Sequence, residues 1–353
     1  YQWETGYGKQ FISVVKADLT NPYLKVDMVM GAGSYTQKAT VSQMANRTGA
    51  VALVNGDFFN TAAQGAPLGA SIVDGKLATA PMNSIGFQAL GIDKSNRAHI
   101  EQITFGGYAT ASNGKKYPIQ GLNKAAYTDN ITGAHSHDDT INLYNDLWTS
   151  KSRGRAGKEC LELLLDGNGI VEEISTGKTL SYVVPKDKII VQANGNAKKF
   201  IDENVKKGEK LVLDYKIRPE KDWQMMIGGH GLLVDKGAVL PYVLAPEAID
   251  GQRARTAAGI SADGKTIYLV AVEGRTNRST GIKLKELAIF MQSIGCEKAL
   301  NFDGGGSTAM SAKHTGELNP ELVISPEKNG SERYVVNGLG IYNTAQEGPL
   351  HQI

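Results

Sequence analysis

This chain is organised around one stretch, Ala299-Leu300-Asn301-Phe302-Asp303-Gly304-Gly305-Gly306-Ser307-Thr308-Ala309-Met310. An apolar run ends at an aspartate, and three consecutive glycines follow it. Consecutive glycines lose much conformational entropy on folding and provide no side chain to pack, so they are kept mainly where the backbone turns sharply or approaches another group closely. The stretch therefore predicts a buried strand that delivers a carboxylate, hydroxyls and backbone amides to one site.

Composition places the chain among globular proteins. It has 353 residues, of which 41% are hydrophobic and 21% charged, enough for one large domain or two ordinary ones. Its 38 Lys and Arg residues oppose 36 Asp and Glu residues, so no global basic field favours nucleic acid or an anionic membrane. No apolar run reaches the roughly 18 to 20 residues that a membrane helix needs. We expect no nucleic-acid partner and no membrane span, and the oligomeric state stays open.

The cysteines and the first residue bear on where the protein works. Cys160 and Cys296 cannot form a disulfide framework, and we expect two buried thiols. The chain begins with Tyr1 rather than Met, as in a processed product from which a signal peptide has been removed. A cysteine-poor, secreted or cell-envelope-associated bacterial protein is the resulting expectation.

Hydrophobic patterning predicts an α+β fold, with a mixed, β-rich central sheet and a few packed helices. We expect a single domain over residues 1–353, with an inserted β-rich subdomain at about residues 100–225, where short strands and turn signals recur. Near the start, Gln10 to Leu19 and Leu24 to Met30 alternate apolar and polar residues. We expect these two strands to pair across Thr20-Asn21-Pro22.

Three short helices are expected. One runs from Thr40 to Arg47 behind a threonine N-cap, and another from Lys198 to Val205. The third begins at Ser279 or Thr280 as its N-cap and continues to about Gly295.

Polar residues stand at the ends of four predicted strands: Asn55 and Asp57; Arg255 and Thr256; Glu273 and Arg275; and Asp303 with Ser307 and Thr308. Arginine side chains match phosphate in a bidentate manner, and the amides of a glycine-rich turn can form an anion-binding nest. The glycine stretch lacks the lysine and spacing of a P-loop and is no G-x-G-x-x-G unit, so we expect no nucleotide cofactor. Two structural alternatives stay open: an ordinary turn around Asn55, and a salt bridge between Glu273 and Arg275.

Histidines offer two further candidates. His230 lies between glycines and two apolar runs, and it is either an acid, base or hydrogen-bond donor, or a structural residue. The loop His135-Ser136-His137-Asp138-Asp139 contains metal-binding residue types. Because alternating residues on one short loop cannot all face one ion, we favour a solvated loop there, and metal dependence stays open.

The stretch Asn301 to Thr308 resembles the N-L-D-G-G-G-S-[AT] signature of the phosphodiester glycosidase family, which includes an animal enzyme that cleaves N-acetylglucosamine-1-phosphodiesters. Other segments resemble further family elements in family order, across roughly residues 10–343: Val54 to Phe59 (N-G-x-[FY]-F), Ile227 to Gly229 (I-G-G), Arg255 to Ala257 (R-T-A), Glu273 to Arg275 ([DE]-G-R), the helix Leu284 to Gly295 with Glu286, and Arg333 with Asn337 (R-x-x-x-N). Asp57 departs from the family's common glycine, and His230 from a smaller residue.

The resemblance implies hydrolysis of a sugar-1-phosphodiester at the anomeric carbon, which releases free sugar and a phosphomonoester. In a bacterium the substrate would be a phosphodiester-linked wall polymer or exopolysaccharide. We expect Asp303 and Glu273 to act as nucleophile or base, and His230 as proton donor. Asn55 and Asp57 are expected to bind the sugar, and the phosphate is expected to be bound by Arg255, Arg275 and the amides of Gly304, Gly305, Gly306 and Ser307. Thr256 and Thr308 are expected to make further substrate contacts. The alternative is a non-catalytic module that binds an anionic wall glycan.

Overall fold

The computed structural model describes residues 1–60, 65–82, 87–128, 132–244 and 251–345, and it is built mostly of β-strands. These strands form four sheets. Within the described ranges there are three short α-helices: α1 (Val41–Thr48), α2 (Asn196–Asn204) and α3 (Leu284–Ser293). The β-rich part of the expected fold is therefore confirmed, whereas the helices are too few to form a layer of their own.

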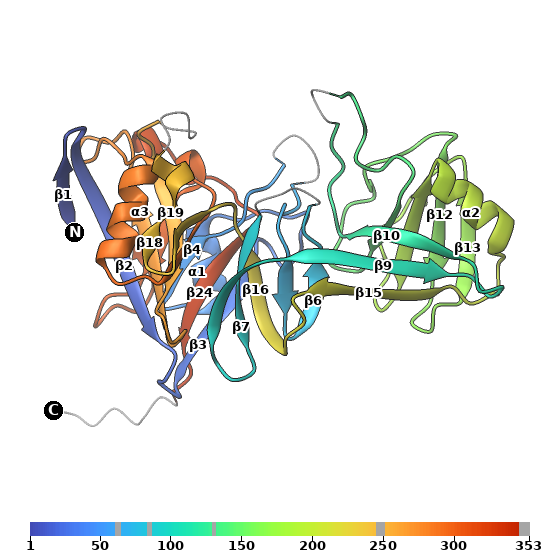
Figure 1. The fold of residues 1–353 in the computed structure, drawn as a ribbon, viewed down its shortest axis with the longest axis horizontal. Coiled ribbons are helices and arrows are strands. Elements are labelled where there is room, and N and C mark those ends of the chain that lie inside the picture. The colour runs from blue at the N-terminus through green and yellow to red at the C-terminus, as the bar shows by residue number, and fades with distance from the viewer. Residues whose placement is uncertain (61–64, 83–86, 129–131, 245–250, 346–353) are drawn as a thin grey trace.

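Three of the sheets make up a first lobe (Figure 1). The largest has the strand order β1 (Gln2–Thr5), β2 (Gly8–Asp18), β20 (Thr266–Val272), β19 (Arg255–Ile260), β21 (Lys298–Asn301), β17 (Leu232–Asp235), β18 (Ala238–Val239). The second has the order β23 (Glu321–Leu322), β22 (Met310–Ala312), β4 (Ala52–Asn55), β24 (Asn337–Asn343), β3 (Leu24–Met30). The third has the order β6 (Lys76–Thr79), β5 (Ser71–Val73), β16 (Trp223–Gly228), β7 (Gln88–Asp93), β8 (Ala98–Gln102).

The fourth sheet belongs to a second lobe, and the long strands β9 and β15 lead into it from the first lobe (Figure 1). Its order is β13 (Val171–Thr176), β12 (Cys160–Leu165), β14 (Ile189–Asn194), β11 (Ile141–Tyr144), β10 (Lys116–Leu122), β9 (Thr104–Thr110), β15 (Val212–Arg218). This lobe has a hydrophobic core of its own, centred on side chains such as Leu122, Leu163 and Val191. We interpret it as the inserted subdomain.

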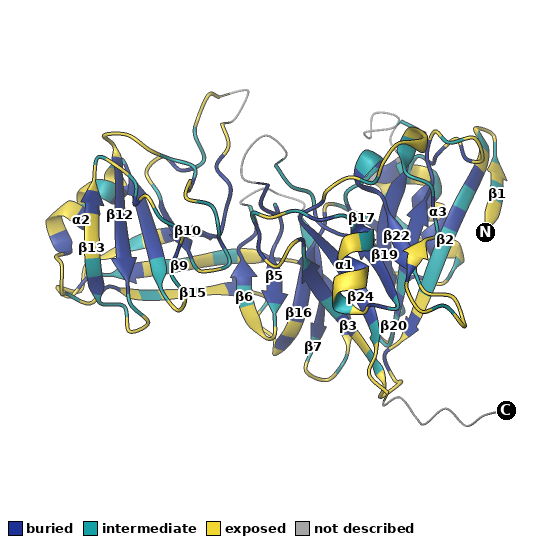
Figure 2. Ribbon diagram, turned by 180° about the vertical axis from the view of Figure 1, so that it is seen from behind, coloured by how far each residue is buried: buried dark blue, intermediate teal, exposed yellow. Residues whose placement is uncertain are grey.

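The first lobe's core is shared by its three sheets. Leu90 of β7, Ile227 of β16, Leu269 of β20, Leu300 of β21 and Leu339 of β24 belong to one buried cluster. The central strands of both lobes are buried, while β15 is exposed along much of its length (Figure 2). Burial on both sides explains why the apolar runs before Asn55 and Asp303 are continuous rather than alternating.

Two local expectations were wrong. Strands β2 and β3 do not pair with each other, because β2 lies between β1 and β20, and β3 pairs with β24 in a different sheet. Helix α3 begins at Leu284, after Lys283 as N-cap, rather than at Ser279 or Thr280. The Ser279 hydroxyl instead donates a hydrogen bond to the carbonyl of Glu273.

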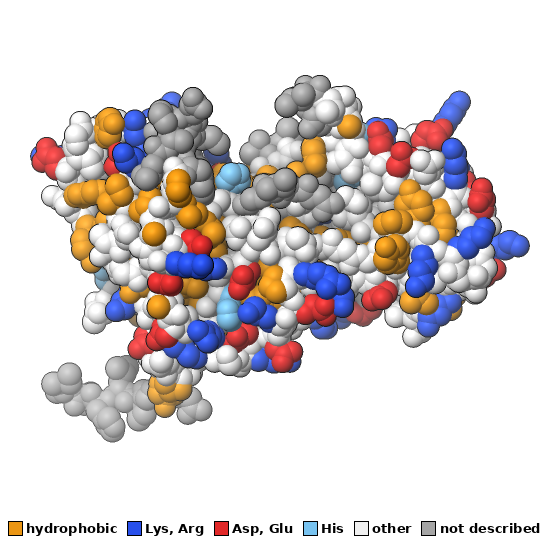
Figure 3. Space-filling view, in the orientation of Figure 1, with side chains coloured by type: hydrophobic (Ala, Val, Ile, Leu, Met, Phe, Trp, Pro, Cys, Tyr) orange, Lys and Arg blue, Asp and Glu red, His pale blue; other side chains and the backbone are white. Residues whose placement is uncertain are grey.

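Two other local expectations, the threonine cap of the first helix and the buried free thiols, were confirmed. Thr40 caps α1 in a reciprocal capping box with Gln43, which satisfies an amide at the helix N-terminus. Cys160 and Cys296 are free, buried thiols in different lobes. Within the described residues, no helix combines the length and apolar character needed to cross a membrane. Acidic and basic side chains are interspersed over the face in Figure 3, consistent with a net charge of +2.

The second lobe contains a fully buried ion pair. The Arg153 guanidinium donates from Nε and Nη2 to the two carboxylate oxygens of Glu162, at 2.8 Å each. The Leu180 amide and the Gln192 side chain also donate to this carboxylate. Removal of either partner would leave a buried charge without its counter-ion.

We expect Arg153→Met to lower the free energy of unfolding by about 3–5 kcal/mol, because it strands the Glu162 carboxylate in an apolar interior. Chemical denaturation followed by tryptophan fluorescence measures this change. The control is Lys216→Met, which breaks an exposed pair with Glu220 in the same lobe and should change stability by about 0.5 kcal/mol or less. Equal effects of the two variants would contradict the importance of the buried pair.

Candidate functional site

A buried amide joins three strand ends at the predicted site. The Nδ2 of Asn55, the last residue of β4, donates to the carbonyl of Asp303 at 2.7 Å. Its Oδ1 accepts from the Thr256 hydroxyl at 2.6 Å and from the Ala309 amide at 3.2 Å. Backbone bonds from Asp303 N–H to Gly56 O and from Phe302 N–H to Thr256 O, each 2.9 Å, complete the junction. The side chains of Asn55 and Thr256 therefore hold the site together.

The three glycines form a tight turn, with a 3₁₀ segment at Gly305–Ser307 and a positive φ of 60° at Gly305. Most of its amides bond inside the protein: Gly304 N–H to the Asp303 carboxylate, Gly305 N–H to Ala254 O, and Ser307 N–H to Gly304 O. These three amides are thus already engaged, contrary to an open phosphate-binding nest.

The missing side chains make room for arginines. A Cβ on Gly306 would lie 2.6 Å from Nη2 of Arg333, and a Cβ on Gly305 would lie 3.0 Å from Nη2 of Arg253. Arg333 Nη1 also donates to the Ser307 hydroxyl at 3.2 Å. Both arginines were visible in the sequence, Arg253 beside Arg255 and Arg333 in the R-x-x-x-N element, but the sequence analysis selected neither as a site residue.

The two arginines that the sequence selected lie close by in different settings. Arg255 is buried, and its guanidinium donates to the carbonyls of Ile282 and Gly251. Arg275 is partly exposed, and it donates to Gln252 O at 3.2 Å and lies 4.0 Å from the Glu327 carboxylate. Glu327 also pairs with Arg253 at 3.4 Å, so Arg253 and Arg275 converge on one carboxylate.

Asp303 occupies the centre of this arrangement. Burial raises the pKa of its carboxyl, while hydrogen bonds from Ser307 and the Gly304 amide and the positive charges of Arg333 and Arg253 oppose that rise. A desolvated carboxylate beside arginines is poised for nucleophilic or general-base chemistry.

Glu273 is held differently from the expectation. Its carboxylate accepts from Arg278 Nε at 2.9 and 3.0 Å, from the Thr276 hydroxyl at 3.0 Å and from the Ser325 amide. Burial alone would raise its pKa, but these hydrogen bonds and the charge of Arg278 hold the pKa below its ordinary value. Its salt-bridge partner is therefore Arg278 rather than Arg275, and its oxygens are occupied by protein donors.

Asp57 is buried beside the same junction. Its Oδ2 accepts from the Gly69 amide at 2.7 Å, and its Oδ1 has no hydrogen-bond partner among the described residues. Burial raises its pKa to about 7; the Gly69 amide and the charge of Lys124 oppose that rise, and the charge of Asp303 adds to it. Lys124 stands in an ordinary stretch, Leu122-Asn123-Lys124-Ala125, with no sequence signal for a site.

His230 lies at the surface next to two aromatic rings. The ring centroids of Phe58 and Phe87 are 5.3 and 5.1 Å from its imidazole, and burial against its surroundings lowers its pKa. Its backbone amide donates to Asn301 O at 2.9 Å, which places it beside the end of β21.

The loop His135 to Asp139 is only partly solvated. Asp138 is exposed, but His137 is buried, its Nε2 is 2.8 Å from the Tyr144 hydroxyl, and desolvation lowers its pKa to about 3. The solvated-loop interpretation is therefore wrong for His137, which the Tyr144 hydrogen bond draws inside. Within the described ranges, no group of three or more His, Cys, Asp or Glu side chains is placed to hold a metal ion.

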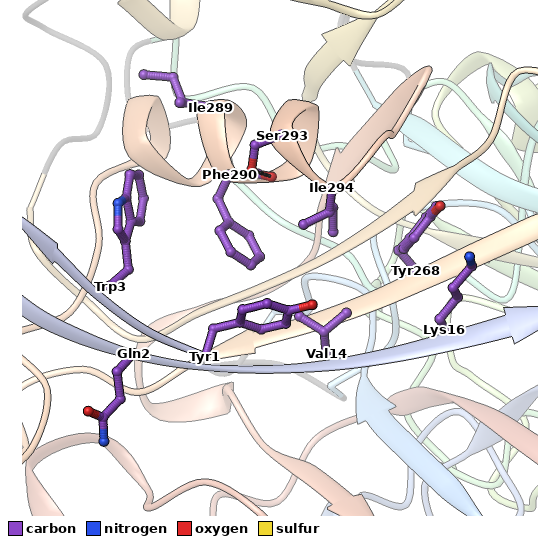
Figure 4. A pocket seen from close by; sticks show the side chains of 10 residues that line it. All are labelled: Tyr1, Gln2, Trp3, Val14, Lys16, Tyr268, Ile289, Phe290, Ser293 and Ile294. Atoms are coloured by element: carbon purple, nitrogen blue, oxygen red, sulfur yellow. Dashed lines mark hydrogen bonds between the residues drawn. The ribbon is translucent and has the colours of Figure 1, made fainter.

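A groove of about 640 Å³ lies apart from these residues, between the β1 and β2 strands and α3 (Figure 4). Phe290 and Ile294 point from α3 toward the strands, and the rings of Tyr1 and Phe290 are 5.7 Å apart. None of the sequence-selected residues lines this groove, so we assign it no part in the chemistry.

Comparison with known proteins decides the family. A family model described as phosphodiester glycosidase matches residues 161–342. The chain belongs to the phosphodiester glycosidase family. The matched region contains Arg255, Glu273, the glycine turn and Arg333, whereas Asn55 and Lys124 precede it.

Two solved structures extend the likeness over the whole fold. A hypothetical protein from Synechocystis has a TM-score of 0.78 at 20% identity, covering 97% of this chain and 61% of that one. A putative exported protein from Burkholderia pseudomallei has a TM-score of 0.77 at 23% identity, covering 95% and 74%. An uncharacterised SPβ prophage-derived protein of Bacillus subtilis, YomE, is 36% identical over 89 residues. That match covers 25% of this chain and only 12% of YomE, and the two structures show the shared fold alone.

We expect Asn55→Ala to lower the free energy of unfolding by about 2–4 kcal/mol, because it leaves buried partners in three segments without hydrogen bonds. Thermal or chemical unfolding of the full chain measures the loss. Asn46→Ala, at an exposed position on α1, is the control and should change stability by about 0.5 kcal/mol or less. A loss no greater than the control's would show that the Asn55 amide does not hold the junction.

Proposed function

We propose that this member of the phosphodiester glycosidase family hydrolyses a sugar-1-phosphodiester at the anomeric carbon and releases free sugar and a phosphomonoester. The observation that supports it most is the desolvated Asp303 carboxyl at a glycine turn flanked by Arg253 and Arg333. Family membership supports the same reaction class.

In the proposed reaction the arginines bind the phosphodiester and stabilise the departing phosphomonoester. A phosphomonoester is a better leaving group than a sugar alkoxide, so its departure depends less on protonation. Asp303 acts at the anomeric carbon as nucleophile, or as the base that takes a proton from water. His230, at the surface next to β21, is the candidate proton donor, and Arg255 and Arg275 extend the positive surroundings of the phosphate.

We further propose a bacterial wall polymer or exopolysaccharide as the substrate, with N-acetylglucosamine as a candidate sugar, and action outside the cytoplasm. Support comes from the family's reaction class and from a structural relative described as a putative exported protein. An anionic wall-glycan binding module is the alternative, and turnover of a UDP-sugar or another sugar-1-phosphodiester separates the two.

Asp303→Asn should reduce kcat on a glycosyl-1-phosphodiester by about 10²- to 10⁴-fold, because the amide can neither attack nor accept a proton. Release of reducing sugar measures turnover, and a thermal unfolding curve shows that the variant is folded. Glu273→Gln is the matched comparison. It should lower the free energy of unfolding and change kcat little, because the Glu273 carboxylate is bound by Arg278. The reverse pattern would assign the reaction to Glu273, and no turnover by the unmodified protein would favour the binding module.

Arg333→Gln should lower kcat/KM for the phosphodiester by about 10- to 100-fold, as expected for loss of a charged hydrogen bond, and leave an uncharged aryl glycoside within about threefold. Arg275→Gln tests the sequence-selected arginine in the same way. Parallel kinetics on both substrates gives the comparison. Equal losses on the charged and uncharged substrates would remove the phosphate role from the arginine concerned.

A further inference from the structure

One peptide unit separates two buried charges next to the candidate site. Lys124 Nζ donates to Leu68 O at 2.9 Å, and the N–H of the same peptide unit, on Gly69, donates to Asp57 Oδ2 at 2.7 Å. Because the C=O and N–H of a trans peptide point in opposite directions, the ammonium and the carboxylate stand on opposite sides of it. The ammonium polarises the carbonyl, and this strengthens the N–H as a donor to Asp57.

Two glycines enclose the Asp57 carboxylate. A Cβ on Gly69 would lie 2.8 Å from Asp57 Oδ2, and a Cβ on Gly228 would lie 2.4 Å from the same oxygen. Side chains at either position would push the carboxylate away from the peptide that holds it. The glycine of the Ile227-Gly228-Gly229 element therefore fits the carboxylate that this chain carries at position 57.

The pair is electrostatically coupled to Asp303. Gly56, next to Asp57, accepts the Asp303 amide hydrogen bond, and the charge of Asp303 raises the pKa of Asp57. Burial lowers the pKa of Lys124 to about 7, and the charge of Asp57 opposes that fall. Burial therefore shifts both pKa values toward neutrality, and the charge of each group opposes the shift of the other.

Neighbouring groups do not mask these two titrations. Tyr35 interacts with Asp57, but burial raises its pKa well above neutrality, so it stays uncharged. His137 faces Lys124 and stays neutral, because its pKa is about 3. Arg253 and Arg333 add positive charge near Asp303, and this charge opposes the rise in the pKa of Asp303.

We propose that Asp57 and Lys124 are positioning residues that act through Asp303, with Lys124 setting the charge of Asp57 across the Leu68–Gly69 peptide. Lys124 follows β10, so the second lobe supplies part of the site's electrostatics. The proposal rests on the proposed function, since its main readout is the hydrolysis that Asp303 performs.

The sign of the pH response follows from the charges. Ionisation of Asp57 places a second negative charge beside Asp303 and repels the anionic phosphodiester, so activity falls as pH rises through the titration of Asp57. Loss of the Lys124 charge makes ionisation of Asp57 less favourable, so the fall moves to higher pH. An amide at position 57 cannot ionise, so the fall disappears.

The test compares kcat/KM against pH for the full chain and for Lys124→Met, Asp57→Asn and the control Lys116→Met, an exposed lysine on β10. We expect the alkaline limb to move up by about 1 pH unit in Lys124→Met, to vanish in Asp57→Asn and to stay in place in Lys116→Met. An equal loss at every pH, an unchanged limb in both site variants, or a shift to lower pH in Lys124→Met would overturn the proposal. If Lys124→Met fails to fold, Asp57→Asn alone decides.

A second readout does not depend on the substrate. The ¹³C carboxyl resonance of Asp57, assigned by its loss in Asp57→Asn, should titrate near neutral pH in the unmodified protein and at higher pH in Lys124→Met. A shift of this titration without any phosphodiester turnover would contradict the proposed function and retain the Asp57–Lys124 coupling. Turnover of the phosphodiester with an unshifted titration would support the proposed function and contradict the Asp57–Lys124 coupling.

Discussion

The buried amide of Asn55 is the interaction on which the site depends. It joins the end of β4 to the start of β19, to the segment after β21 and to the residue before β22, and its bonds to Thr256, Asp303 and Ala309 leave each of these segments little freedom. A carboxylate that must react at one atom needs such a fixed backbone, because small errors of position slow reactions steeply. From the sequence we expected Asn55 to bind the substrate. In the structure, both polar atoms of its side-chain amide are bonded to the protein, where they fix the positions of neighbouring segments.

The two lobes divide the work unequally. The first lobe supplies Asp303 and the arginines from strand ends and loops that the three sheets bring together. The second has its own core and its own buried ion pair between Arg153 and Glu162, so its fold does not rely on the site. Its proposed contribution through Lys124 is electrostatic and is made across the single Leu68–Gly69 peptide.

Sequence reasoning selected residues that the structure brings together, such as Asn55, Thr256 and Asp303, but it did not select all of their neighbours. The apolar run ending at Asp303 and the adjacent glycines carry a strong local signal, because burial on both faces and tight turning restrict residue choice. Arg253 and Lys124 carry no such signal, and Arg333 was noticed in the R-x-x-x-N element without a role in the site, since their positions depend on contacts between segments far apart in the chain. For the same reason the sequence offered the nearby Arg275 as a salt-bridge partner for Glu273, whereas Arg278 is the partner in the structure. The strand pairing of residues 10–30 failed similarly, because long-range partners outcompeted the nearby turn.

The glycines also bear on how this family can diverge. A Cβ on Gly274 would lie 1.9 Å from the Ala254 backbone nitrogen, which no rearrangement of a side chain could relieve. Such a position is fixed by the close approach of two backbones, whatever chemistry the neighbouring carboxylates perform. A descendant that lost hydrolysis would therefore still keep this glycine. In a distant relative, a glycine at the position of Gly274 would therefore indicate that the fold is kept. The polar side chains around Asp303 would indicate whether the proposed hydrolysis is kept.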